Sequence, residues 1–134
     1  MAITYSVEPD LATAAFVDVL ERSTLARRRP TDDAERARRM VENADIVVCA
    51  RDGAHLVGVA RAITDFSYCC YLSDLAVDVA YRGRGIGTEL MRRAHAAAGD
   101  ETTMVLLSAP DAMSYYARAG LDPIDNGWKI DRRK

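Results

Sequence analysis

The 134-residue sequence has few cysteines, little histidine and no strong excess of charge of either sign. Three cysteines, Cys49, Cys69 and Cys70, are too few for a disulfide framework, and two histidines without a C-x-x-C pair give no zinc-site spacing. Eighteen basic and 20 acidic residues leave a net charge of −2, so no global field attracts nucleic acid or an anionic membrane. We therefore expect reduced cysteines, no metal and no nucleic-acid partner.

Long apolar runs are also missing. No stretch approaches the roughly 20 residues needed to span a bilayer, and the first ten residues lack the basic-then-apolar pattern of a signal peptide. These features predict a soluble, cytoplasmic protein without a membrane partner. Hydrophobic residues make up 49% and charged residues 28% of the sequence, which predicts one globular domain over residues 1–134, without repeats or linkers.

Strand-like and helix-like patterns alternate along the chain. The expected strands are 3–8, 46–50, 56–63, 68–77 and 104–107, and the expected helices are 10–22, 31–44, 86–98 and 110–119. Asp10 is the predicted N-cap of the first helix, and Thr31 or Asp32 is that of the second. A terminal hairpin is expected over 121–130, around Asp125-Asn126-Gly127. This order predicts an α/β or α+β fold, in which helices cover a mixed sheet.

The stretch Tyr81-Arg82-Gly83-Arg84-Gly85-Ile86-Gly87-Thr88 lies between a predicted strand and a predicted helix. Three glycines in five positions cost backbone entropy, which the close approach of a ligand explains. The first turn of the helix presents N–H groups that suit a phosphate, and the two arginines add forked donors for a pyrophosphate. The spacing matches neither the dinucleotide-binding nor the P-loop pattern. A strand-to-helix turn with surface arginines is the alternative interpretation.

Two stretches of the chain together resemble the GCN5-related N-acetyltransferases (GNAT). Arg82-x-x-Gly85-x-Gly87, preceded by Asp74-Leu75-Ala76-Val77-Asp78, is similar to the signature of that family. Tyr116 stands four residues before Gly120-Leu121, where the family has a tyrosine before a Gly-Phe pair. The order of the expected elements matches as well. The resemblance implies a mostly antiparallel central sheet flanked by about four helices, and an acyltransferase that uses acetyl-CoA.

The resemblance also implies roles for individual residues. Pantetheine is expected along a bulged strand at Leu75, Ala76 and Val77, and the pyrophosphate in the loop of Arg82, Gly83, Arg84, Gly85, Ile86, Gly87 and Thr88. Tyr116 is placed to protonate the departing CoA thiolate; a core aromatic is its alternative. Asp74 is the candidate base for the amine proton, with a hydrogen-bonded strand residue as its alternative. No metal is implied.

The chain departs from the family's pattern in two places. The strand 104–107 carries no acid, and the asparagine often found at the start of the next helix is missing from Ser108-Ala109-Pro110-Asp111. Beside an N-acetyltransferase, a non-catalytic acyl-CoA-binding or sensor module of the same fold therefore remains open, as does a phosphate-binding interaction domain.

The sequence says less about the acceptor and the oligomeric state. The resemblance implies a small-molecule amine or a peptide or protein amine as the acceptor, without saying which. The basic run Arg27–Arg29 is interpreted as a solvated loop. Only 14 residues, 121–134, follow Gly120, so the terminal hairpin is expected to be short. A second copy of the chain is expected to complete its edge, as a homodimer.

Overall fold

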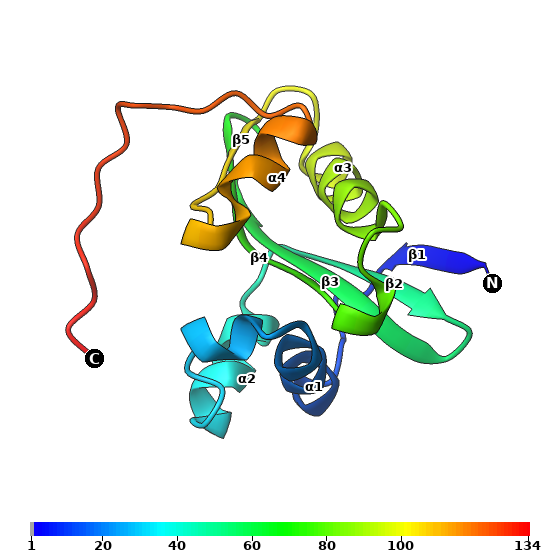
Figure 1. Ribbon diagram of the computed structural model, residues 1–134. Coiled ribbons are helices and arrows are strands. Elements are labelled where there is room, and N and C mark those ends of the chain that lie inside the picture. The colour runs from blue at the N-terminus through cyan, green and yellow to red at the C-terminus, as the bar shows by residue number, and fades with distance from the viewer. Residues whose placement is uncertain (1) are drawn as a thin grey trace.

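The computed structural model describes residues 2–134, which fold into a sheet with helices on both faces (Figure 1). The elements in chain order, with short 3₁₀ helices labelled η, are β1 (Ile3–Val7), α1 (Thr13–Ser23), η1 (Leu25–Arg28), α2 (Ala34–Glu42), β2 (Ile46–Asp52), β3 (His55–Thr64), β4 (Cys69–Val77), η2 (Val79–Tyr81), α3 (Ile86–Ala98), β5 (Thr103–Val105), η3 (Pro110–Ala112) and α4 (Met113–Arg118).

The sheet is mixed and mostly antiparallel, which confirms the predicted fold class. Its strand order is β1-β2-β3-β4-β5; neighbours are antiparallel up to β4, and β5 is parallel to β4. The parallel step requires a crossover, which α3 provides. The predicted hairpin turn between β2 and β3 is confirmed: Gly53 follows Asp52 with φ of +60°, in the left-handed region that glycine enters without steric cost.

Each face of the sheet has its own apolar core. On one face, α3 buries a stripe against the strands, and α4 packs beside it; the α3 residues are Ile86, Leu90, Met91, Ala94 and Ala98. On the other face, α1 and α2 pack through Phe16, Val19, Leu20 and Val41 onto Val47, Cys49 and Val59. Residues three or four apart on each helix supply these stripes, as the sequence pattern predicts.

Both predicted N-caps of the first two helices are wrong. Residues 9 and 10 form a turn closed by the Leu11 N–H donating to the Glu8 carbonyl at 3.2 Å, and α1 starts only after Ala12. The α2 cap is Asp33, one residue beyond the predicted pair, and its carboxylate accepts from the Arg36 N–H at 3.0 Å. A run of candidate cap residues permits several starting points, and the turn before the helix decides among them.

The predicted terminal hairpin is also wrong. Residues 121–134, all of which the structure describes, contain no strand and no helix. After Leu121 this segment runs away from α4 as an extended chain (Figure 1, orange to red). A two-stranded hairpin is marginal without a surface to pack on, and Asp125-Asn126-Gly127 does not reverse the chain into paired strands here. Within the described residues, no helix is long and apolar enough to cross a bilayer.

Candidate functional site

The outer edge of β4 is open along most of its length. The strand pairs with β3 from Cys70 to Val77, with one irregularity, but with β5 only at its first three residues, Cys69 to Tyr71. From Leu72 to Val77 that edge has no strand partner among residues 2–134. Peptide groups on a free edge can hydrogen-bond an extended ligand in the manner of an added strand. Leu75, Ala76 and Val77 lie on this open stretch.

The open stretch begins at a β-bulge. Arg61 on β3 lies opposite Asp74, whereas its neighbour Ala62 lies opposite Leu72, so Ser73 is an extra residue on β4. A bulge bends the strand and changes the direction of its peptide groups. The family resemblance implies such a bulge in this strand, and the structure contains it.

Two arginines hold the bulge through Asp74, whose side chain is completely buried. The Arg29 Nε donates to one carboxylate oxygen at 2.5 Å, and the Arg61 Nε donates to the other. The same arginines donate to the bulge residue: Arg29 to the Ser73 carbonyl at 2.7 Å and Arg61 to the Ser73 hydroxyl at 2.8 Å. One negative charge thus lies between two positive ones.

These contacts do not support the prediction that Asp74 takes a proton directly from an amine. Both of its oxygens already accept hydrogen bonds from guanidinium groups, and the side chain does not reach solvent. The sequence analysis missed both partners. Arg61 was detectable, because a charged residue inside the apolar run 56–63 needs a partner when it is buried. Arg29 was not, because nothing in Arg27–Arg29 distinguishes the residue that turns inward.

The glycine loop leads from β4 and η2 into α3. Gly83 and Gly85 have φ of +79° and +76°, and a Cβ built on either would meet no atom within 4 Å. Both glycines therefore serve a left-handed turn that faces open space. Gly85 is the N-cap of α3, and the first bond into the helix runs from the Glu89 N–H to the Gly85 carbonyl at 3.1 Å. The N–H groups of Ile86, Gly87 and Thr88 precede it and carry the positive end of the helix dipole.

The two loop arginines make contacts on the protein itself. The Arg82 guanidinium donates to the Ser23 carbonyl at the end of α1. The Arg84 guanidinium lies over the Tyr81 ring, 5.0 Å from its centroid, and the Tyr81 hydroxyl donates to Asp52 at 2.7 Å. The loop is thus anchored to α1 and to the β2–β3 hairpin, which fixes its position beside the open edge of β4.

Two neighbouring tyrosines of α4, Tyr115 and Tyr116, lie on the α3 side of the sheet, and Tyr115 contacts the glycine loop. Tyr115 and Tyr116 pack edge to face, with ring centroids 5.2 Å apart. The Tyr115 hydroxyl hydrogen-bonds the Thr88 hydroxyl at 3.0 Å, and a Cβ on Gly87 would lie 2.6 Å from the Tyr115 oxygen. A side chain at Gly87 would therefore displace the Tyr115 hydroxyl from this close approach. Sequence reasoning missed the contact, because it gave Tyr115 no part in the loop.

Tyr116 is half-buried on the same side of the sheet as α3. Burial raises the pKa of its phenol above the usual 10, the nearby Tyr115 raises it further, and the positive charge of Arg29 acts in the opposite direction. The phenol keeps its proton at neutral pH, which is the form that a general acid needs.

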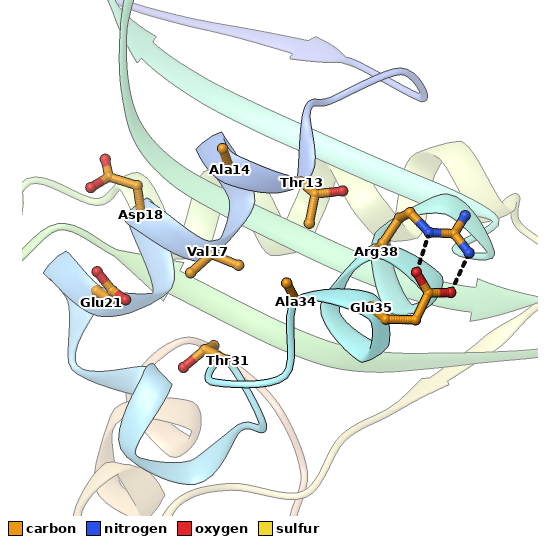
Figure 2. A pocket seen from close by; sticks show the side chains of 9 residues that line it. All are labelled: Thr13, Ala14, Val17, Asp18, Glu21, Thr31, Ala34, Glu35 and Arg38. Atoms are coloured by element: carbon orange, nitrogen blue, oxygen red, sulfur yellow. Dashed lines mark hydrogen bonds and ion pairs between the residues drawn. The ribbon is translucent and has the colours of Figure 1, made fainter.

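A separate groove lies between α1 and α2, with a volume of about 730 Å³. Figure 2 shows its aliphatic floor of Ala14, Val17 and Ala34, and the bidentate pair between Glu35 and Arg38 at one end. No residue of β4, the glycine loop or α4 lines it. Among the described residues no cluster of three His, Cys, Asp or Glu side chains is placed to hold a metal. The groove is therefore separate from the open edge of β4 and from the glycine loop.

Comparison with known proteins agrees with this geometry. A sequence model of the Acetyltransferase (GNAT) family matches residues 13–121. The chain belongs to the GNAT acetyltransferase family. A putative acetyltransferase from Deinococcus radiodurans R1 is 26% identical, with a TM-score of 0.75 over 98% of this chain and 88% of that one. Comparison with curated proteins gives no match.

Two further GNAT-like structures show the shared fold at lower identity. A probable acetyltransferase from Staphylococcus aureus is 18% identical, with a TM-score of 0.79 over 98% of this chain and 100% of that one. An aminoglycoside N-acetyltransferase, solved in complex with CoA, is 15% identical, with a TM-score of 0.74 over 99% of this chain and 96% of that one. The five-stranded sheet and four helices are therefore a GNAT fold.

Proposed function

We propose that this GNAT protein transfers an acetyl group from acetyl-CoA to a primary amine by direct attack. The proposal rests above all on the open edge of β4, which leads into the glycine loop at the N-terminus of α3. An extended pantetheine chain fits the first feature, and a pyrophosphate fits the second. In this arrangement Leu75, Ala76 and Val77 bind pantetheine, and residues 82–88 surround the pyrophosphate.

We further propose that Tyr116 is the general acid. The amine nitrogen attacks the thioester carbonyl carbon, the C–S bond then breaks, and the departing sulfur takes the phenol proton. The proton that the amine nitrogen sheds on becoming an amide passes to water, and solvent returns a proton to the phenolate. Burial supports this role, because it keeps the phenol protonated. Asp74 acts as a positioning residue: it fixes Arg29 and Arg61, and with them the bulge that sets the direction of the β4 peptide groups.

We propose a small-molecule, peptide or protein amine as the acceptor. Transfer of the acetyl group needs no metal. We place the protein in the cytoplasm, where acetyl-CoA is available. A second copy of the chain is the proposed macromolecular partner, because β5 leaves one sheet edge uncovered among the described residues. A non-catalytic CoA-binding module is the alternative function; the missing acid on β5 favours it, and the intact Tyr116 favours the enzyme.

Acetylation of a panel of amines tests the proposed function. Acetyl-CoA is incubated with the protein and each amine, and the acetylated amine is detected by mass spectrometry. This readout is preferable to a thiol reagent, because exposed Cys69 would react as well. Product that forms only with protein and amine together supports the enzyme. Tight CoA binding without product for any amine class would instead establish the non-catalytic module.

The loop has its own test in Gly85→Val. We expect CoA affinity to fall by roughly 10- to 150-fold, the equivalent of one charge-assisted hydrogen bond of about 1.5–3 kcal/mol. The branched side chain would enter the open space that the phosphates need. Affinity for a pantetheine fragment, which has no pyrophosphate, should change little. Calorimetric titration of both ligands measures the difference.

Gly53→Val is the matched control, since Gly53 also has a left-handed φ and open space around its Cβ position. Both variants carry a backbone strain of about 1–2 kcal/mol. Only Gly85→Val should lose CoA affinity. Equal losses in the two variants, or equal losses for CoA and pantetheine, would mean that strain and not phosphate access is responsible.

The raised pKa of the Tyr116 phenol predicts the alkaline behaviour of the reaction. The group is protonated and active below its pKa, so it should impose no loss of activity until the pH exceeds about 10. With an alkylamine, kcat/KM should rise with pH as the free amine accumulates. A falling limb below pH 9 that is absent from Tyr116→Phe would show that the phenol loses its proton too early, and would contradict the raised pKa.

A further inference from the structure

The segment between α1 and α2 contributes a cation to the β4 bulge. Of its three consecutive arginines, Arg27 and Arg28 are exposed, which agrees with the predicted solvated loop, but Arg29 turns toward β4. For Arg29 that prediction is wrong. Its guanidinium donates to the Asp74 carboxylate at 2.5 Å and to the Ser73 carbonyl at 2.7 Å. The Arg29 side chain is nevertheless 23% exposed, so it forms part of the surface beside the bulge.

The cluster around Asp74 has one positive charge in excess. Arg29 and Arg61 share this single carboxylate, and no second carboxylate pairs with either arginine among residues 2–134. The side chains of Asp74 and Arg61 are 0% and 9% exposed, so water screens these charges poorly. A guanidinium cannot lose its proton to relieve the excess. Because an uncompensated charge is costly away from water, the cluster favours a further anion.

Arg29 also keeps hydrogen-bond donors for such an anion. A guanidinium has five N–H groups. Arg29 uses three of them, toward Asp74, toward the Ser73 carbonyl and, at 2.9 Å, toward the Arg28 carbonyl. One N–H on each terminal nitrogen remains, and two N–H groups are what a carboxylate accepts from an arginine in a bidentate pair. Arg61 is less suitable, because its guanidinium is almost completely buried.

The proposed direction of acetyl-CoA places Arg29 near the reacting group. With the pyrophosphate in the glycine loop, pantetheine runs along the open edge of β4 from Val77 back to Leu75. The thioester, at the far end of pantetheine, then lies beside the bulge at Ser73. Arg29 comes from the segment between α1 and α2, and it reaches the bulge from the face of the sheet that these helices cover. It therefore borders the thioester end of the open edge.

We infer that Arg29 binds a carboxylate of the acceptor, and that the acceptors are small amines that carry a carboxylate, as amino acids do. The excess charge around Asp74 attracts the carboxylate, and the two remaining N–H groups of Arg29 orient it. The amine then reaches the thioester from the α1 and α2 face, whereas Tyr116 lies on the α3 side. The inference rests on the proposed function and narrows its substrate class.

Matched amines test the inference. A series of ω-amino carboxylates, from glycine to longer members, is compared with alkylamines and diamines of the same length, and the acetylated products are measured by mass spectrometry. At the best chain length, kcat/KM per free amine should be roughly 10- to 150-fold higher for the amino carboxylate than for the alkylamine, the effect of one charge-assisted hydrogen bond. Equal values, or a preference for the diamine, would overturn the inference and leave acetyl transfer intact.

Arg29→Gln should reduce this preference to within about threefold, since the charge and the fork are both lost. A purely structural role in the bulge would lower kcat/KM for both amines by the same factor. An unchanged ratio therefore contradicts carboxylate binding by Arg29. Arg27→Gln, which removes an exposed charge from the same segment, is the control and should keep the preference of the parent. An equal loss in the control would mean that the field of the segment, and not Arg29, selects the acceptor.

A binding measurement distinguishes failure of this inference from failure of the proposed function. Calorimetric titration of each amino carboxylate into the protein, with and without CoA, requires no turnover. Acetylation of none of the amines would contradict the proposed enzyme. Binding of an amino carboxylate, weakened by Arg29→Gln and not shown by the matched alkylamine, would still support the carboxylate site. If no amino carboxylate binds and none is acetylated in preference to its alkylamine, the inference is wrong.

Discussion

Tyr116→Phe should lower turnover by roughly 10²–10⁴, the usual contribution of one general acid. The substitution keeps the ring and removes only the hydroxyl, so packing of α4 on the α3 side of the sheet should persist. CoA affinity and melting temperature should hardly change, because the lost proton transfer acts in the transition state. Steady-state kcat, CoA titration and thermal unfolding measure the three quantities on the same preparation.

Tyr5→Phe is a suitable control for this substitution. Tyr5 lies on β1 under the Arg93 guanidinium, and partial burial raises the pKa of its phenol as well. Tyr115→Phe is not a neutral control, because the Tyr115 hydroxyl contacts Thr88 in the loop. A Tyr116→Phe variant that turns over within about threefold of the parent would show that solvent protonates the thiolate and that Tyr116 is structural.

Asp74→Asn should destabilise the fold by about 3–5 kcal/mol, the cost of leaving a buried charge without its partner. Two guanidinium groups share this single carboxylate, so both lose their counter-charge at once. For a domain of this size the melting temperature should fall on the order of 10–20 °C. Asp18→Asn, at the exposed end of a pair with Arg22, should change stability by less than about 0.5 kcal/mol.

The pH dependence of the same Asp74→Asn variant separates positioning from proton transfer, when it is measured well below its melting temperature. If Asp74 took the amine proton, turnover would fall at pH 7 and recover as the pH approached the pKa of the amine, near 10.4. If it positions Arg29 and Arg61, the loss persists across the pH range. We expect the persistent loss.

Much of this fold could be predicted from the sequence because its signals are local. Gly53 at the hairpin, Gly85 at the start of α3 and the spacing of Leu90 and Ala94 each depend on a few neighbouring residues, and the structure places these residues as predicted. The glycine loop was recognisable for the same reason. Its strand-to-helix context is continuous in the sequence.

The failures concern contacts between distant segments. Arg29 and Asp74 are 45 residues apart, so their pairing gives no local signal, and the sequence does not reveal that both oxygens of Asp74 accept hydrogen bonds. The prediction of a terminal hairpin failed for a different reason. Trp128 and Ile130 do have a strand pattern, but a strand forms only where an edge receives it, and residues 121–134 do not pair with their own sheet.

The most direct test of the central claim is thermal unfolding of the protein with increasing acetyl-CoA. A ligand that binds only the folded state at the β4 edge and the α3 N-terminus should raise the melting temperature. The stabilisation should reach about 2.7 kcal/mol at a concentration 100 times the dissociation constant, and Gly85→Val should need far more ligand for the same rise. A folded protein whose melting temperature does not change at millimolar acetyl-CoA would contradict the proposed site and the proposed activity.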